Sequence, residues 1–158
     1  MINIRQATID DAVAMAYIMR SLSHFYLDEG VTEIPQWLLD GSSVSQFEQR
    51  LVSEEFTSFV YIHPGQKPHT GEIAGFISLK HFTNRLHLQS LFVAEAEQGR
   101  GVARALWRHV QAQFPAKHYT VRSSLYAVPV YRAFGFVEEG EVQENRGACY
   151  QAMALHPL

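Results

Sequence analysis

The chain has 158 residues, and we expect residues 1–158 to form one domain that is large enough to bury a core. Hydrophobic residues make up 47% of it and charged residues 18%, without repeats or biased tracts, which excludes a disordered chain and a solenoid. No apolar run is long enough to cross a bilayer and no leader pattern opens the sequence, so we expect a cytoplasmic protein without a membrane partner.

The formal net charge of −3 is unevenly distributed. Residues 21–58 contain seven acids and one arginine, a balance of −6, whereas residues 98–132 contain six bases and no acid, a balance of +6. The first segment should repel anions and the second should attract them. Because the basic residues are not interleaved with stacking aromatic residues, we expect no nucleic-acid partner. The one cysteine, Cys149, fits a buried strand position better than a reactive thiol.

The N-terminal third predicts a strand followed by two helices. Residues 3–7 read as a short strand, and the helix after it should end near Gly30. The apolar residues at helical spacing along this first helix are Met15, Ile18, Leu22 and Phe25. Ser43 and Gln46 form a capping-box pattern before a second helix. The join over residues 30–41 is left open.

Strands and helices alternate in the rest of the chain. From residue 58 the apolar period changes to two, which predicts strands at 59–63, 72–82 and 87–93. A helix should follow residue 101 and end at Pro115. The remaining elements are a strand, a short helix and two closing strands, at 119–124, 127–134, 136–142 and 148–155. This order indicates an α/β or α+β fold around a mixed sheet.

The stretch EQGRGVARALW, residues 97–107, places two glycines at the start of a predicted helix. Without side chains at Gly99 and Gly101, the first backbone N–H groups of the helix can approach an anion closely. Arg100 and Arg104 can add paired hydrogen bonds to phosphate oxygens. A tight, well-packed turn is the alternative reading. Two other phosphate loops do not fit, because a dinucleotide fingerprint needs glycine at 104 and a Walker loop needs Gly-Lys-Ser/Thr.

The same stretch resembles the acetyl-coenzyme A signature of the GCN5-related N-acetyltransferase (GNAT) superfamily, Gln/Arg-x-x-Gly-x-Gly/Ala, with Gln98 at its first position and Ala103 at its last. Two further stretches support the resemblance. SLFV, residues 90–93, looks like the strand that leads into the signature, and AVPVYRAFGF, residues 127–136, looks like the later helix with its Tyr-x-x-x-Gly-Phe motif.

The resemblance implies a GNAT-like single domain with a mixed, mostly antiparallel sheet of about seven strands and about four helices. Its fourth and fifth strands should splay apart and leave a slot for the thioester of acetyl-CoA, the implied co-substrate. Strand residues implied to pair with the pantetheine arm are Leu91, Phe92 and Val93. Residues implied to hold the pyrophosphate are Gln98, Gly99, Arg100, Gly101, Val102, Ala103 and Arg104. Ser124 stands where many members have an asparagine that faces pantetheine.

The resemblance also implies an acid and a base. A protonated amine must lose a proton before it attacks a thioester, and the departing thiolate benefits from a proton. Tyr131 matches the family's proton donor, although a core tyrosine is the alternative. His87 is the candidate base, since it aligns with a catalytic glutamate of some members and strand alternation puts it on one face with Gln89, Leu91 and Val93. It could equally be a histidine that only lines the pocket. We expect no metal.

The implied activity is acetyl transfer from acetyl-CoA to a primary amine, on a small molecule or a peptide. The acidic balance of residues 21–58 favours a cationic amine, a lysine or an N-terminal amine, and the expected substrate-binding residues are Tyr26, Glu29, Glu33 and Trp37. A catalytically silent acyl-CoA sensor is the alternative, and an NAD-binding fold is a weaker one. A homodimer through the strand edges of residues 136–155 is also possible.

Overall fold

The computed structural model describes residues 3–25, 36–63, 73–116, 118–145 and 148–157. Its α-helices are α1 (Ala12–Ser21), α2 (Gln36–Gly41), α3 (Val44–Val52), α4 (Val102–Gln113) and α5 (Val128–Phe134). Its strands are β1 (Ile4–Gln6), β2 (Phe56–Ile62), β3 (Ile73–His81), β4 (Leu86–Val93), β5 (Tyr119–Ser124), β6 (Val137–Glu138), β7 (Gln143–Asn145) and β8 (Ala148–Leu155). Single turns of 3-10 helix lie at Ile9–Asp11, Ser23–Phe25, Glu95–Glu97 and Leu125–Ala127.

The strands form one sheet in the order β1-β2-β3-β4-β5-β8-β6, with β7 also paired to β8. All neighbours are antiparallel except β4 and β5, which are parallel. The predicted mixed, mostly antiparallel fold is therefore confirmed. The described strands number eight because the strand predicted over 136–142 is reduced to β6, which ends before a bend at Gly140 with φ 71°, and an additional strand, β7, follows it.

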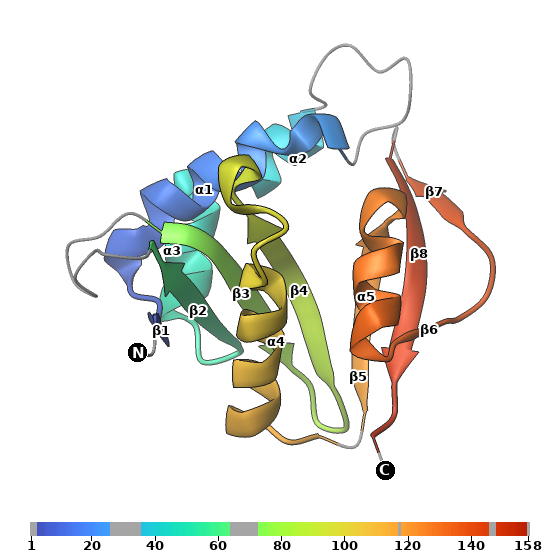
Figure 1. Ribbon diagram of the computed structural model, residues 1–158. Coiled ribbons are helices and arrows are strands. Elements are labelled where there is room, and N and C mark those ends of the chain that lie inside the picture. Colours follow the sequence, from blue (N-terminus) through green and yellow to red (C-terminus); the bar gives the residue numbers. More distant parts are fainter. Residues whose placement is uncertain (1–2, 26–35, 64–72, 117, 146–147, 158) are drawn as a thin grey trace.

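The parallel pair β4 and β5 is joined at one end only. Leu86, His87 and Leu88 pair with Tyr119, Thr120 and Val121, and no register partners follow on either strand. The remaining residues of β4, up to Val93, and of β5, up to Ser124, therefore lack each other as backbone partners. Figure 1 shows the two strands diverging toward the ends that lead into α4 and α5. The splay between the fourth and fifth strands is as predicted.

A β-bulge interrupts β4 and overturns one prediction. Ser78 pairs with Ser90 but Leu79 pairs with Leu88, so Gln89 has no partner on β3. The extra residue shifts the alternation of side chains, as a bulge does. Leu88 and Leu91 consequently share one face. The expectation that His87 shares a face with Leu91 and Val93 is therefore wrong.

Two hydrophobic clusters cover the two faces of the sheet. α4 and α5 lie over one face (Figure 1), where Leu106, Trp107 and Val110 of α4 are buried. α1 and α3 pack on β2, β3 and β4 from the other face around Met15 and Phe47. Helical spacing predicted α4 correctly.

Two smaller predictions have different outcomes. The Ser43 cap of α3 is confirmed, because its hydroxyl accepts a hydrogen bond from the Gln46 N–H at 3.2 Å. The expected core position of Cys149 is wrong, since this residue faces Glu144 across β7 and β8 and is only half-buried. α2 begins within the join that the sequence left open.

Candidate active site

A cavity of about 700 Å³ opens where β4 and β5 separate. Its walls are the end of β4, the turn before α4, the end of β5 and the first turns of α5. Ten of the predicted cofactor residues line it: Leu91, Phe92, Val93, Gln98, Gly99, Gly101, Val102, Ala103, Arg104 and Ser124. Tyr131, the predicted acid, lines it as well. A second hollow, of about 430 Å³ beside α1 and α3, contains none of the predicted site residues.

The turn before α4 owes its shape to its two glycines. Gly99 has φ +79° and Gly101 has φ +82°, and a Cβ built at either position would meet nothing within 4 Å. Both positions therefore have room for a side chain, and they require glycine only because their backbone is left-handed. Gly101 is the N-cap residue of α4 and lines the cavity, so the positive end of the helix dipole faces the cavity.

Gln98 ties this turn to the end of β4. Its Nε2 donates to the Val93 carbonyl at 3.1 Å, and its Oε1 accepts from the Tyr126 hydroxyl at 3.4 Å. The signature glutamine therefore connects the turn, β4 and the segment after β5. This is a positioning role that the sequence motif alone did not reveal.

The backbone of β4 turns alternate groups toward β3 and toward the cavity. Ala94 N–H donates to the Ala74 carbonyl at 2.8 Å, which sets the direction of every second residue. Phe92 shares that direction, and its carbonyl oxygen lies 2.9 Å from a Cβ built on Gly75 of β3. The polar groups of Leu91 and Val93 thus face the side from which β5 has departed. An extended ligand can pair with Leu91 and with the N–H of Val93, whose carbonyl already accepts from Gln98, whereas the backbone of Phe92 is turned toward β3.

Arg100 is the one predicted cofactor residue that does not line the cavity. It is exposed, and its Nη1 lies 3.7 Å from Oε2 of Glu97. The other carboxylate oxygen of the buried Glu97 is 2.8 Å from Nε2 of His63. The carboxylate of Glu97 therefore contacts both Arg100 in the glycine turn and His63 just after β2, which fixes the 3-10 turn at Glu95–Glu97.

Tyr131 projects from α5 into the protein rather than into solvent, and only 5% of it is exposed. Its ring packs edge-on against Phe134 and Phe136, with centroids 6.0 and 5.6 Å away. Burial raises the pKa of the Tyr131 hydroxyl above its ordinary value. The phenol is consequently protonated at neutral pH and lines the cavity as a potential proton donor.

His87 lies outside this cavity, in the paired section of β4 and β5. Its Nδ1 is 2.8 Å from the Thr120 hydroxyl, which also accepts a 3.1 Å hydrogen bond from Arg85. Burial is the main reason that the pKa of His87 falls to about 4, and the charges of three cations lower it further. These cations are Arg85, Arg122 and Lys80. The ring is therefore neutral at pH 7.

Ser124 lines the cavity, but its hydroxyl is engaged in the backbone. It accepts from the Ala127 N–H at 3.3 Å and so caps the single turn at Leu125–Ala127. The predicted contact with pantetheine would have to share this oxygen.

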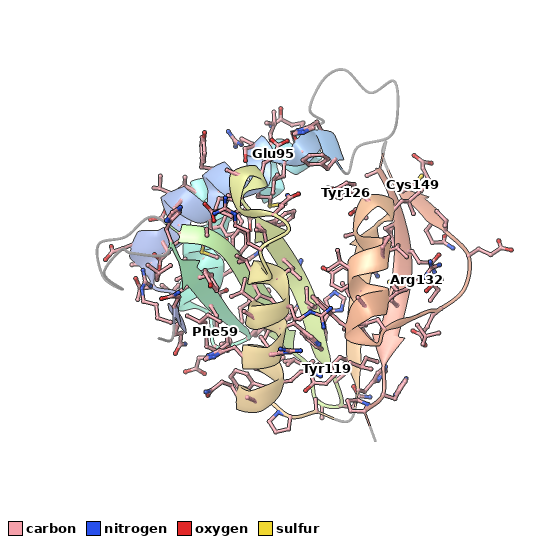
Figure 2. All side chains as sticks on the ribbon, in the orientation of Figure 1. Phe59, Glu95, Tyr119, Tyr126, Arg132 and Cys149 are labelled. Atoms are coloured by element: carbon pink, nitrogen blue, oxygen red, sulfur yellow. The ribbon has the colours of Figure 1, made fainter. Side chains whose placement is uncertain are left out.

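The structure places an aromatic pair in the site, although the sequence favoured a core position on the apolar helix face for Phe25 and gave no role to Tyr126. Phe25 stacks on Tyr126 with ring centroids 4.7 Å apart, and both rings line the cavity. Figure 2 shows Tyr126 at the end of α5 nearest to the N-terminal helices. The pair joins the segment after α1 to the segment after β5 across the cavity mouth. The available sequence signal was an aromatic residue two positions after Ser124, to which no motif assigned a role.

The predicted acceptor residues cannot be placed. Tyr26, Glu29 and Glu33 lie outside the described residues, and so does the side chain of Trp37. Over the described part of the chain, no group of three or more histidine, cysteine or acidic side chains is arranged to hold a metal ion. No helix in that same part has both the length and the apolar character required to cross a membrane.

Comparison with known proteins identifies the family. Residues 26–157 match the model of the acetyltransferase (GNAT) domain. The chain belongs to the GNAT acetyltransferase family. A search of the curated proteins found no match.

Solved GNAT structures share the fold at low sequence identity. A GCN5-related N-acetyltransferase from Rhodopseudomonas palustris superposes with a TM-score of 0.75 at 20% identity, over 98% of this chain and 94% of that one. The PaiA N-acetyltransferase from Thermoplasma acidophilum, in complex with coenzyme A, has a TM-score of 0.72 at 15% identity and 99% coverage of both chains. An aminoglycoside 6'-N-acetyltransferase complexed with coenzyme A has a TM-score of 0.72 at 13% identity, over 99% and 97%.

Proposed function

We propose that this GNAT protein transfers an acetyl group from acetyl-CoA to a primary amine by direct attack of the amine on the thioester. The observation that carries the proposal is the cavity itself, which is lined by the glycine turn before α4, the open side of β4 and Tyr131. A sensor would need the first two features, but it would have no use for a buried proton donor beside them.

The residues of the cavity fit coenzyme A chemically. The turn at Gly99 and Gly101, the start of α4 and the guanidinium of Arg104 suit a pyrophosphate. Leu91 and Val93 offer backbone groups to an extended amide-bearing arm, as a neighbouring strand would accept them. Acetyl-CoA would supply an activated acyl thioester at the inner end of that arm.

Tyr131 is assigned the proton that the leaving sulfur requires. As the carbon–nitrogen bond forms and the carbon–sulfur bond breaks, the phenol O–H donates its proton to the thiolate and later regains one from solvent. Its raised pKa keeps this proton in place across the neutral range. A donor of this kind contributes roughly 10²- to 10⁴-fold to the rate.

The proton lost by the amine needs an acceptor, and His87 remains the prediction from the sequence. Its position on the far face from Leu91, and its occupied Nδ1, give it no direct path to the cavity. We propose that water carries this proton, so that His87→Gln should retain kcat within about tenfold at saturating acceptor. A fall of kcat to the level of a Tyr131 variant would instead make His87 the base.

Release of coenzyme A thiol, measured against amines, polyamines, aminoglycosides, amino acids and peptides, tests the proposal. We expect acceptor-dependent release with an acetylated product of matching mass. In Tyr131→Phe, kcat should fall by at least about 10²-fold, while KM for acetyl-CoA should change little. Tyr126→Phe, at the cavity mouth, is the matched control and should keep its kcat. Binding of acetyl-CoA without release for any amine would favour a sensor instead.

A further inference from the structure

Three basic side chains gather beside His87, on the face of the sheet opposite to α4 and α5. Lys80 of β3 is the cross-strand partner of His87, and Arg85 immediately precedes β4. Arg122 lies on β5 next to Val121, and strand alternation puts its side chain on the opposite face from Tyr119 and Val121, which pack beneath α4. We call Lys80, Arg85 and Arg122 the basic cluster.

Aromatic rings hold the basic cluster in place. Arg85 lies 4.3 Å from the centroid of the Phe82 ring, and Lys80 lies 5.2 Å from the same centroid. Arg122 lies 5.4 Å from the centroid of the Tyr150 ring on β8. Cation–π contacts of this kind orient a positive charge without neutralising it.

No acid offsets these charges within the described residues. The ion pairs found there involve Arg5, His63, Arg100 and Arg132, and none includes a member of the basic cluster. The like charges of the basic cluster repel one another, and all three lie near enough to His87 to add to the lowering of its pKa by burial. An anion placed among them would relieve that repulsion.

The hydrogen bonds of His87 add a further donor to this place. Arg85 can only donate to the Thr120 hydroxyl, and we assign the proton of that hydroxyl to a hydrogen bond with Nδ1 of His87, its other partner among the described residues. A neutral imidazole that accepts at Nδ1 carries its proton on Nε2. The ring can then donate from Nε2 to a bound anion.

The basic cluster borders the proposed active site. Arg122 precedes Ser124 by two residues on β5, which corresponds to about 7 Å along a strand and to the same face. Ser124 lines the cavity, and β4 and β5 separate just beyond the pair formed by His87 and Thr120. A small molecule with its amine in the cavity has its other end within reach of Arg122.

We infer that Lys80, Arg85, Arg122 and the Nε2–H of His87 form an anion subsite, which binds a carboxylate or phosphate of the amine acceptor. The substrate class is thus an amine that also carries an acidic group, such as an amino acid, a peptide with a free C-terminus or an amino phosphate. This inference rests on the proposed acetyl transfer. It adds a negative end to the cationic amine that the acidic segment 21–58 led us to expect.

Anion binding is tested first without turnover. Inorganic phosphate is titrated against the whole chain while the His87 ring is followed by NMR. We expect a saturable shift of the His87 signals that Lys80→Gln and Arg122→Gln each weaken by about tenfold in Kd. Arg108→Gln is the matched control, because Arg108 is an exposed arginine of α4 on the other face. Signals that do not move, or that move equally in all variants, would overturn the subsite.

Acceptor preference is tested second, with chemically matched pairs. The pairs are ω-amino acids of increasing length against their amides, and phosphoethanolamine against ethanolamine. We expect a higher kcat/KM for the acidic member, with a ratio that falls by about tenfold or more in Arg122→Gln through KM while kcat is kept. The larger kcat/KM ratio identifies the anion: a larger ratio for the amino acid and amide pairs indicates a carboxylate, and a larger ratio for phosphoethanolamine over ethanolamine indicates a phosphate.

Failure of the two proposals can be told apart. Absence of acetyl-CoA binding and of thiol release would refute acetyl transfer, whereas the phosphate titration would still report on the subsite. Phosphate binding without preference within any acceptor pair would overturn the acceptor assignment. Binding of a fluorescent single-stranded RNA, lost in the same variants, would overturn it too and would indicate a nucleic-acid surface.

Discussion

At the scale of single residues, the ionisation of His87 makes stability depend on pH. Its pKa falls from 6.5 to about 4 on folding, mainly through burial, so the unfolded chain binds this proton first as the solution is acidified. The contribution of His87 is present above pH 6.5 and is lost as the pH falls toward 4. We expect the urea midpoint to fall less steeply between pH 7 and 5 in His87→Gln than in the natural chain. The exposed Gln113, changed to Ala, removes no titratable group and should leave the slope unaltered.

Gln98 offers a second test at this scale. Its removal leaves the Val93 carbonyl without the 3.1 Å hydrogen bond and frees the Tyr126 hydroxyl. Gln98→Ala should therefore raise KM for acetyl-CoA by about tenfold and leave kcat nearly unchanged, because the contact positions the cavity wall and not the reacting atoms. Gln113→Ala, an exposed change at the far end of α4, is the control. A loss confined to kcat would contradict this role.

At the scale of elements, Gly75 lets β3 lie close to the start of α4 and to the end of β4. A Cβ at this position would lie 2.9 Å from the Phe92 carbonyl oxygen and 3.2 Å from Cγ1 of Val102. Gly75→Ala should destabilise the protein by about 1–3 kcal/mol and weaken acetyl-CoA binding, because β4 must shift. Gly41→Ala has nothing within 4 Å of the new methyl group and should be nearly neutral. Chemical denaturation of both variants decides the point.

The sequence predicted the long helices and strands but not α2, β7 or the bulge in β4. Helical spacing located α3 and α4, and period-two alternation located the long strands, because each pattern follows directly from side-chain direction. The bulge at Gln89 escaped prediction, since one extra residue in β4 has no signature in composition and yet reverses which face His87 occupies. α2 and β7 were missed because short elements depend on tertiary contacts.

At the scale of the whole molecule, the site lies where two halves of the sheet separate. The two family motifs predicted the turn before α4 and Tyr131 of α5 as site residues, and these residues, although distant in sequence, line one cavity. They did not predict Phe25 or Tyr126, because a contact between the segments after α1 and after β5 exists only in the folded chain. The sequence did not predict the basic cluster for the same reason, because its members belong to β3, the connection before β4, and β5.

A ligand that spans these halves should stabilise the entire fold. The proposed acetyl-CoA site exists only where the turn before α4, β4 and the segment after β5 are assembled, so we expect this ligand to bind the native state alone. At a concentration of 100 times Kd, the free energy of unfolding should rise by about 2.7 kcal/mol. A thermal or urea melt with and without acetyl-CoA measures it, with adenosine as a control ligand that lacks the pantetheine arm.

The measurement that tests the central claim most directly is a calorimetric titration of acetyl-CoA into the natural chain, Arg104→Gln and Arg108→Gln. The two arginines are exposed and lie one turn apart on α4, but only Arg104 lines the cavity. We expect one site per chain, with binding weakened by about tenfold in Arg104→Gln and unchanged in Arg108→Gln. No binding to the natural chain, or equal loss in both variants, would contradict the assignment of this cavity to coenzyme A.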